Sequence, residues 1–355
     1  MSNFLNKIIK SSGNKYASIV KDGLPGSDIT GYVDTGSMMF NALLSGSIFN
    51  GIPNNKVLGL AGESATGKTY FTLGVVNNFL NQHKNGVVLY WDSEQAVTTD
   101  MFVKRGIDTS RVSVLPVATV EDFRKQANSI VDSYLEENEK ERVPMMFVLD
   151  SLGMLSTSKE MADVSEGKET RDMTRAQLIK SSFRVLMIKL GNAKIPMIVT
   201  NHTYSIINSY VPTKQMGGGD GLRYAASTVV YLSKKKDKDA SGETIGSIIH
   251  CNLYKGRFTK ENQVIDVRLN YDNGVEKYYG LVDLALEAGI FTKNSTRIVF
   301  PDGSSAFEKH IYSNPEKYFT PEVLKKLDEA AAKKFKYGMG ESVEESIEEI
   351  DTDGD

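Results

Sequence analysis

The stretch that decides the fold is GESATGKT, residues 62 to 69, which has the spacing G-x-x-x-x-G-K-T. Gly62 and Gly67 let consecutive backbone N–H groups point inward at an anion. Lys68 is placed to contact the β- and γ-phosphates of a nucleotide, and the Thr69 hydroxyl is placed to hold Mg²⁺. The pattern therefore predicts a nucleotide-binding loop. Its candidate residues are Gly62, Glu63, Ser64, Ala65, Thr66, Gly67, Lys68, Thr69 and the following Tyr70.

The surroundings of this loop support the prediction. Residues 56 to 62, KVLGLAG, read as a buried strand, and residues 68 to 82 carry apolar side chains at helical spacing. A helix that begins near Lys68 adds the positive end of its dipole to the anion site. A chance glycine turn is the alternative, but an eight-residue pattern between strand and helix favours the phosphate loop.

Composition bounds the class of protein. The chain has 355 residues, 40% of them hydrophobic, which suffices for one large or two modest domains. No stretch has the length of a membrane span and the first residues lack a signal-peptide core, so we expect a soluble, cytoplasmic protein without membrane partners. Cys251 is the single cysteine and the four histidines are scattered, which argues against disulfides and structural zinc.

The net charge of −3 is unevenly distributed. Residues 341 to 355 carry eight carboxylates and no Lys or Arg, which leaves 42 basic against 37 acidic residues, or +5, in the remainder. Two interpretations stay open. The tail keeps the protein soluble, or it competes with nucleic acid for a basic surface.

Strand and helix patterns alternate from about residue 35 to 270, which predicts an α/β fold with a mostly parallel sheet and ligands at the carboxyl ends of its strands. The predicted buried strands are residues 56–62, 86–92, 111–117, 145–150 and 195–201. Three later runs have no helix between them and are expected to continue the sheet as antiparallel neighbours. These runs are residues 227–233, 245–256 and 263–271.

The two ends of the chain differ from this core. The first 25 residues hold an amphipathic stretch, FLNKIIK, and a strand-like run, YASIV, with little core of their own. Near the other end, Thr320 as N-cap, Pro321 at the first helical position and Gly338 as the stop predict a helix. The expected division is an arm for subunit docking (1–32), the nucleotide-binding core (33–280), a small helical region (281–340) and an acidic disordered tail (341–355).

Hydrolysis of a nucleotide needs carboxylates beside the phosphate loop. Asp150 ends the run MMFVLD and suits a carboxylate that orients a water on the metal. Glu94, in LYWDSEQAV, is our candidate for aligning or deprotonating the attacking water, with Asp92 as the alternative. An acidic cluster that merely starts a helix remains the structural interpretation of this segment.

These motifs, in this order and spacing, resemble the RecA-type recombinases. The resemblance covers roughly residues 33 to 290 and includes further stretches that are similar to the phage branch of that family. They are DSLGMLSTSKE, DMTRAQLIKSSFR, NHTY, MGGG and YYGLVDLALEAG. It implies a RecA-like P-loop NTPase core and a DNA-dependent ATPase that uses ATP and Mg²⁺ and releases ADP or AMP. The implied function is DNA strand exchange: helical filaments on single-stranded DNA that pair it with homologous duplex in recombination, repair and replication.

The resemblance also implies roles for residues outside the phosphate loop. Segments 156–175 and 203–221 correspond to two DNA-binding loops, with contacts from Lys159, Lys214, Gly217, Gly218, Gly219 and Arg223. Asn201 and His202 would sense the γ-phosphate. Lys255 and Arg257, at i and i+2 on one face of a strand, would reach the ATP of the adjacent subunit. Phe102 or Met101 would stack on the adenine. Single-strand-binding and mediator proteins are the expected partners.

Other functions remain possible at this stage. A hexameric DNA helicase shares the core, but it typically carries a separate helical N-terminal domain, for which the first 30-odd residues are too few. A small-molecule kinase needs an Arg-rich lid, and a non-enzymatic ATP-binding regulator does not need Glu94. The run KKKDKD, residues 234 to 239, either catches duplex DNA or is a solvated hairpin tip.

Overall fold

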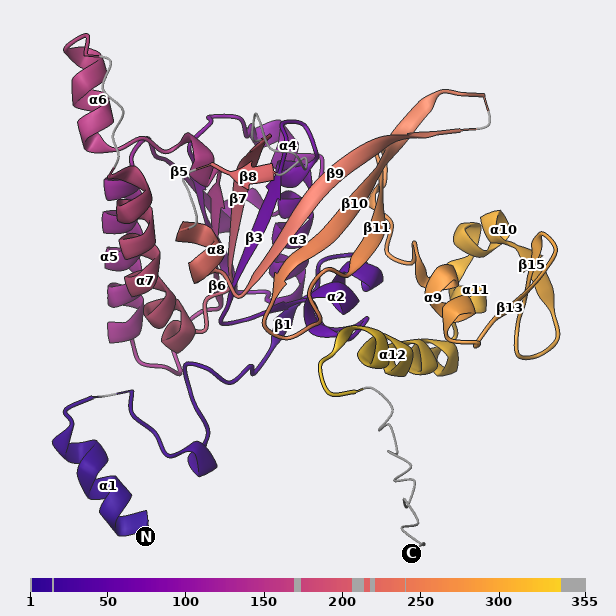
Figure 1. Ribbon diagram of the computed structural model, residues 1–355, viewed down its shortest axis with the longest axis horizontal. Helices are drawn as coiled ribbons and strands as arrows, with labels where there is room; N and C mark the ends of the chain where they lie inside the picture. Colours follow the sequence, from indigo (N-terminus) through magenta and orange to yellow (C-terminus); the bar gives the residue numbers. More distant parts are fainter. Residues whose placement is uncertain are drawn as a thin grey trace, which may run out of the picture.

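A computed structural model describes residues 2–14, 16–168, 174–205, 214–217, 221–239 and 241–339. Its centre is a 10-stranded sheet with the strand order β12-β11-β10-β9-β3-β7-β6-β4-β5, and β8 pairs with β7 beside this path. Figure 1 shows this sheet between the helices and the C-terminal region at the far end from α5. The predicted α/β fold class is confirmed.

The parallel half of the sheet arises from alternating strands and helices. Strand β3, which precedes the phosphate loop, lies between β7 and β9 and is fully buried. A parallel strand covered on both faces must be apolar throughout, as VLGLAG is. The elements of this half are β3 Val57–Gly62, α3 Lys68–Gln82, β4 Val87–Asp92, α4 Thr99–Val103, β5 Val112–Pro116, α5 Val120–Glu136, β6 Met145–Asp150, α6 Ser158–Ser165, α7 Arg175–Ala193 and β7 Met197–Ser205.

The later strands depart from the expected pattern in one respect. Strand β9 joins the sheet parallel to β3, because the helix α8 returns the chain before it, whereas β10, β11 and β12 are each antiparallel to the strand before them. These elements are β8 Lys214–Met216, α8 Gly221–Ala225, β9 Thr228–Lys238, β10 Thr244–Gly256, β11 Val264–Asn270 and β12 Gly274–Val275. Figure 1 shows β9 and β10 extending beyond the body as a long hairpin. Lys234, Lys235 and Lys236 lie along it, exposed.

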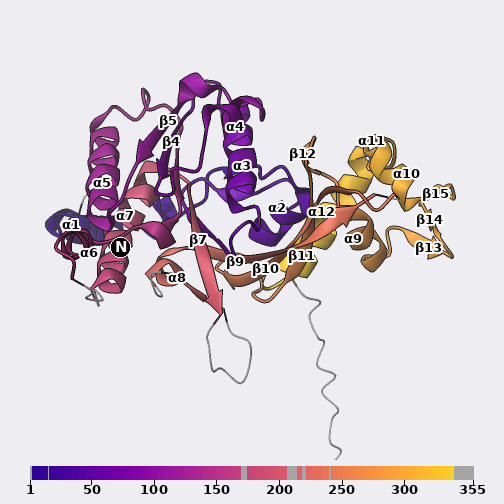
Figure 2. The same ribbon diagram turned by 90° about the horizontal axis from the view of Figure 1, so that it is seen from above.

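Each face of the sheet is covered by its own apolar core. Figures 1 and 2 show α5 and α7 side by side on one face, and α3 and α2 on the other. Trp91 faces the first core, where it packs edge-on against Phe123 of α5, whereas Phe71 of α3 packs against Phe40 of α2 in the second. Strand β5 was expected to be buried, but it is the edge of the sheet and its side chains are partly or fully exposed.

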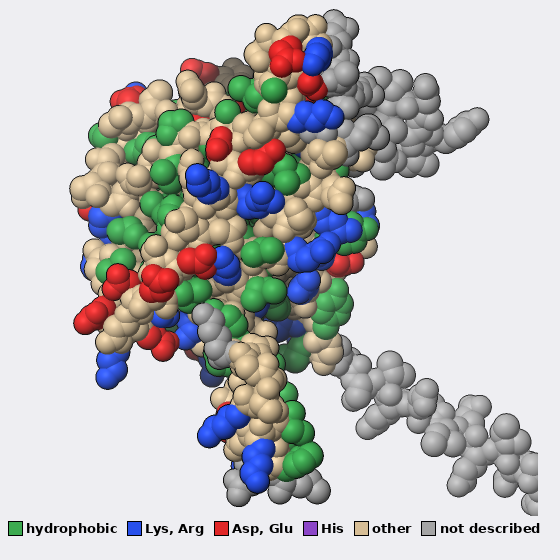
Figure 3. All heavy atoms as spheres, turned by 90° about the vertical axis from the view of Figure 1, so that its left-hand side faces the viewer, with side chains coloured by type: hydrophobic (Ala, Val, Ile, Leu, Met, Phe, Trp, Pro, Cys, Tyr) green, Lys and Arg blue, Asp and Glu red, His purple; other side chains and the backbone are tan. Residues whose placement is uncertain are grey.

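The N-terminal part begins with helix α1, Ser2–Ser11, which exposes Phe4, Leu5 and Ile8. In Figure 3 this projecting helix carries hydrophobic side chains along one edge and lysines along the other. The strand expected in YASIV does not form, and only a short 3-10 turn follows, at Val20–Asp22. Next come β1 Tyr32–Val33, α2 Met38–Ser45 and β2 Ile52–Pro53. An arm without a partner strand has no ladder to join, which explains the missing strand.

The C-terminal region was expected to be helical, but it also contains strands. It contains a 3-stranded sheet of β13 Thr292–Asn294, β14 Arg297–Val299 and β15 Ser305–Phe307. Its helices are α9 Leu281–Glu287, α10 Glu308–Ser313, α11 Pro315–Tyr318 and α12 Pro321–Phe335. The predicted capping of α12 is confirmed, because the Thr320 hydroxyl accepts the backbone N–H of Val323. The acidic tail lies outside the described residues.

Among the described residues, none of the helices combines the length and the hydrophobicity needed to cross a bilayer.

Candidate active site

The phosphate loop occupies the turn between β3 and α3, where its glycines meet two different demands. A Cβ on Gly62 would lie 2.7 Å from the Leu232 carbonyl oxygen, so only glycine fits beside the neighbouring strand. Gly67 has a φ of 90°, in the left-handed region that favours glycine, and starts α3. The loop therefore leads directly into the positive end of the α3 dipole, as the sequence predicted.

Lys68 is turned back into the loop. Its Nζ donates hydrogen bonds to the carbonyl oxygens of Gly62, at 2.9 Å, and Glu63, at 2.8 Å. Burial lowers the pKa of the Lys68 amine below its usual value, although the nearby carboxylates of Asp150 and Glu94 oppose this effect. A buried ammonium that donates to carbonyl oxygens is a strong binding group for phosphate oxygens.

Asp150 accepts hydrogen bonds from three hydroxyl groups. Thr69 Oγ1 and Tyr90 Oη each donate to Asp150 Oδ2 at 2.7 Å, and Thr200 donates to the other carboxylate oxygen. Burial first, and then the charge of Asp150, raise the pKa of Tyr90 well above its usual value, so Tyr90 stays a donor. Tyr90 and Thr200 were missed from the sequence, where each appeared only as a polar atom in an apolar run.

The Thr69 hydroxyl and the Asp150 carboxylate are the hard oxygen donors that Mg²⁺ prefers, and they already contact each other. The residues present thus fit a magnesium nucleotide. Thr69 would bind the ion directly and Asp150 through a water.

Glu94 follows the end of strand β4, which β7 and β6 separate from β3, and it is near enough to Lys68 for the two charges to interact. One of its oxygens, Oε1, accepts a hydrogen bond from Ser151 Oγ at 2.6 Å and lies 2.8 Å from Nε2 of His202. Burial alone would raise the pKa of the Glu94 carboxyl. The hydrogen bonds from Ser151 and His202, with the charges of His202 and Lys68, bring that pKa below its usual value. The carboxylate is therefore ionised and fixed in position.

Asp92, the alternative to Glu94, has a structural role in this arrangement. Its carboxylate accepts the backbone N–H groups of Glu94, Ala96 and Val97 at 3.0 to 3.4 Å, and the side chain is buried. Asp92 holds the turn that carries Glu94, so its oxygens are occupied by the backbone.

Asn201 and His202 are adjacent in β7 but point to different partners. His202 meets Glu94, whereas Asn201 Nδ2 donates to the carbonyl oxygen of Gly217 at 2.9 Å. The Gly217 N–H in turn donates to the His202 carbonyl oxygen at 2.9 Å. Two neighbouring residues therefore connect the carboxylate with Gly217 of the second predicted DNA-binding segment.

The predicted DNA-binding residues are only partly described. Lys159 is exposed on α6, and Arg223 lies on α8 with its guanidinium 5.8 Å from the Tyr254 ring centroid. Gly217 follows the end of β8, and Lys214 contributes its backbone to that strand. Gly218 and Gly219 lie outside the described residues.

Lys255 and Arg257 are not brought to the phosphate loop of their own chain. Lys255 Nζ donates to the carbonyl oxygens of Arg223 and Ala226, at 2.7 and 2.8 Å, at the C-terminal end of α8. Their strand pairs with β9 near Thr228, which lies opposite Leu58 at the start of β3. The loop at Gly62 is four strand residues, roughly 13 Å, further along. Lys255 lies in β10, whereas Arg257 lies just beyond the end of that strand, so only one of the two expected strand residues is in a strand.

Neither candidate for adenine stacking is well placed. Phe102 is 4% exposed and packs edge-on against Tyr90 inside the core, so no base can reach its ring. Helix α4 turns this side chain inward, which the sequence did not reveal. Met101, beside it, is partly buried and packs against the same core.

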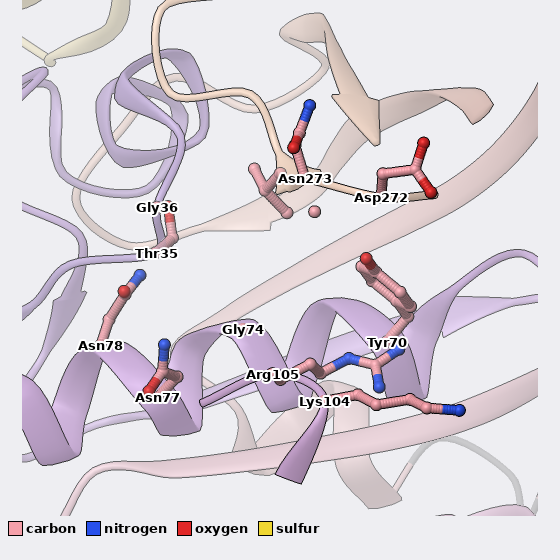
Figure 4. Close-up of a pocket in the computed structure, with 12 residues that line it drawn as sticks. Thr35, Gly36, Tyr70, Gly74, Asn77, Asn78, Lys104, Arg105, Asp272 and Asn273 are labelled. Carbon is pink, nitrogen blue, oxygen red and sulfur yellow. The ribbon is translucent and has the colours of Figure 1, made fainter. Parts of the chain in front are cut away.

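A cavity of about 260 Å³ lies along α3 instead, from Tyr70 to Asn78. Figure 4 shows Tyr70 and Arg105 on one side of it, and Asp272 and Asn273 on the other. The Arg105 guanidinium is 3.9 Å from the Tyr70 ring centroid, and its Nη1 donates to the Met101 carbonyl oxygen at 2.8 Å. Tyr70 directly follows Thr69 in the chain, and this flat cation–aromatic pair is suited to stacking. Arg105 was missed because its role depends on the fold of α4.

The fold and the site define a P-loop nucleotide-binding protein with the strand order and the carboxylate placement of an NTPase core. Comparison with known proteins gives its family. The model of the RecA N-terminal domain matches residues 1–276, so the chain belongs to the RecA family. This confirms the resemblance to the RecA-type recombinases. Among phage proteins, the chain is similar to the UvsX recombinase.

Individual relatives agree with this assignment. The recombination and repair protein of Enterobacteria phage T4 is 34% identical over 295 residues, which are 82% of this chain and 73% of the relative. Protein RecA of Paenarthrobacter aurescens (strain TC1) is 22% identical over 88% of this chain and 86% of its own. Protein RecA of Aquifex aeolicus (strain VF5) is 24% identical over 89% of this chain and 87% of its own. The chain is thus a recombinase with the nucleotide-binding, DNA-dependent ATPase core of its family, and the helicase alternative is not favoured.

Proposed function

We propose that this chain hydrolyses ATP in the presence of Mg²⁺ while it forms helical filaments on single-stranded DNA, and that the filament pairs this DNA with a homologous duplex. The observation that carries the proposal is the position of Glu94, ionised and held by Ser151 and His202 beside the Lys68 loop. ADP is the expected product, with AMP as the further possibility. The host-cell cytoplasm is the expected place of action, with single-strand-binding and mediator proteins as partners.

Glu94 is the proposed base in hydrolysis. Its fixed, ionised carboxylate aligns the attacking water and accepts its proton, while Lys68 stabilises negative charge that develops on the phosphate oxygens. When bound, Mg²⁺ would neutralise phosphate charge and would be held by Thr69 and, through water, by Asp150. Tyr90 and Thr200 keep the Asp150 oxygens directed toward that position.

His202 is the proposed sensor of the nucleotide. A γ-phosphate near Glu94 competes for the same imidazole, because a ring N–H hydrogen-bonds either acceptor. Movement of His202 then shifts Asn201 and, through it, Gly217 at the second DNA-binding segment. This coupling lets bound ATP order the groups that hold DNA, through Lys159, Lys214, Arg223 and the backbone of Gly217, Gly218 and Gly219.

Lys255 and Arg257 are proposed to complete the site of the adjacent subunit. They lie too far from their own phosphate loop, and Lys255 would exchange the α8 carbonyl groups for phosphate oxygens on assembly. Helix α1, with exposed Phe4, Leu5 and Ile8, is proposed to dock on a neighbour, as expected of residues 1–32. Assembly and hydrolysis would thereby depend on each other.

The base of ATP is proposed to bind in the cavity beside Tyr70, stacked on the Arg105 guanidinium. Asp272 and Asn273 on the opposite side offer acceptors and donors for the edge of the base. This replaces the sequence-based candidate Phe102.

Electron microscopy of the protein with single-stranded DNA and ATP tests the proposed function, together with product analysis. Helical filaments that release ADP or AMP are expected. Closed rings, or no assembly despite bound ATP, would contradict it.

A further inference from the structure

A groove between α9 and α12 has no role in the proposed function. It encloses about 480 Å³, and Leu284, Ile290 and Ala330 supply apolar surface to it. Three lysines, Lys326, Lys333 and Lys334, line it together with Glu287 and Glu329. Lys326 also pairs with Glu322, and Lys334 pairs with Glu287. Lys326 and Lys333 are seven residues apart, so they lie on the same face of the helix, and both are exposed. The groove therefore combines an apolar floor with a rim of mixed charge in which lysines outnumber glutamates.

The sequence of the acidic tail has the complementary pattern. Val343, Ile347 and Ile350 are spaced i, i+4 and i+7, which places them on one face of a helix. Glu344, Glu345, Glu348 and Glu349 fall between them, on the flanks and the opposite face. As a helix this segment has an apolar stripe bordered by carboxylates, the counterpart of the apolar floor and lysine-rich rim.

We propose that residues 343–350 dock in the α9–α12 groove of their own chain as a short amphipathic helix. Its length matches the groove, because eight helical residues span about 12 Å, as do the residues between Lys326 and Lys334. Residues 340–342 separate Met339, the last described residue, from Val343, and they reach at most about 10 Å. Met339 itself is five residues beyond Lys334 of the groove, so the segment starts close to it in the chain.

Docking explains how so short a segment becomes helical. An isolated eight-residue helix is unstable in water, because the cost of its first turn is not recovered. Burial of three branched side chains against Leu284 and Ile290 offsets that cost, and the lysine rim adds attraction that salt weakens. The tail thus gains structure only where both complementary surfaces meet.

Amide hydrogen exchange of the full-length chain, without nucleotide or DNA and at low salt, tests the proposal. Residues 343–350 are expected to exchange at least about tenfold more slowly than an unstructured chain. Ile347→Asp should remove this protection although it adds a negative charge, because it places a carboxylate on the apolar floor. The double variant Lys326→Glu and Lys333→Glu should also remove it. The double variant Lys125→Glu and Lys140→Glu, at two exposed lysines away from the groove, serves as the charge-matched control and should leave it intact.

Two results would overturn the proposal. Equal exchange of residues 343–350 in the unaltered protein and in Ile347→Asp would show that no apolar contact holds the tail. Protection that falls on dilution would show that the tail binds a second copy. Neither measurement involves ATP or DNA, so failure of the proposed catalytic function leaves this test unaffected.

Discussion

Glu94 Oε1 lies 2.8 Å from His202 Nε2, although 108 residues separate them in the chain. The two side chains come from the ends of β4 and β7, which the parallel sheet brings to the same edge. Since the neighbour of His202, Asn201, bonds Gly217, this contact links the proposed catalytic base with the second predicted DNA-binding segment. The pair can therefore be tested from either end.

Glu94→Gln should separate binding from hydrolysis. The amide keeps the size of the side chain and a hydrogen-bonding oxygen, but it cannot accept a proton from water. ATP binding and filaments on DNA should persist, while the DNA-stimulated turnover falls by about 10²–10⁴-fold. Filter binding of ATP and phosphate release measure the two properties. Loss of ATP binding as well would make Glu94 a structural residue.

Ser151→Ala should change the pH dependence of hydrolysis. The hydroxyl is one of the groups that lower the pKa of Glu94, so its removal moves that pKa upward. The acid limb of the rate profile should then shift to higher pH, because the base must be ionised. The lowered pKa of Glu94 also stabilises the folded protein at a pH above the pKa that Glu94 has in the unfolded chain. This stability is lost as the pH falls through the pKa of Glu94 in the folded protein. An unchanged acid limb would mean that another group is titrated.

Arg105→Ala and Phe102→Ala form a matched pair for the base pocket. Loss of Arg105 removes a stacking surface and should weaken ATP binding by about tenfold, with little effect on folding. Loss of the buried Phe102 should lower the free energy of unfolding by about 3–5 kcal/mol and leave the ATP dissociation constant of the folded protein unchanged. Calorimetric titration and urea denaturation measure the two effects, and the reversed pattern would restore Phe102 as the stacking residue.

Lys68→Ala should reduce turnover by about 10²–10³-fold, since it removes the charge matched to the phosphates. The double variant Lys255→Ala and Arg257→Ala should bind ATP through its intact loop and yet hydrolyse it poorly. A mixture of these two proteins contains complete sites, because each supplies what the other lacks. It should recover part of the DNA-dependent ATPase. If energy transfer between labelled subunits shows co-assembly without recovery, the basic pair does not act across the interface.

Much of this fold followed from local pattern. The phosphate loop, the parallel strands and the capped helix at Thr320 were predicted because each depends on neighbours in sequence. The parallel joining of β9 and the inward position of Phe102 were not, because both depend on how distant elements pack. The same holds for the site. Glu94 and Asp150 could be proposed as site residues from their strand ends, but Tyr90, Thr200 and Arg105 acquire their contacts only from the three-dimensional arrangement.

The separation between the phosphate loop at one end of β3 and the basic pair at the other gives each subunit a front and a back. With the proposed exchange across the interface, a chain of n subunits contains n − 1 finished sites. One terminal subunit therefore binds ATP in a site that lacks the basic pair of a neighbour, and it should not hydrolyse that ATP. The rates at which subunits add and dissociate should therefore differ between the two ends. Very short assemblies should have a lower ATPase rate per subunit than long ones. In an unassembled subunit Lys255 stays bonded to the carbonyl groups at the end of its own α8, and such a subunit should hydrolyse almost no ATP.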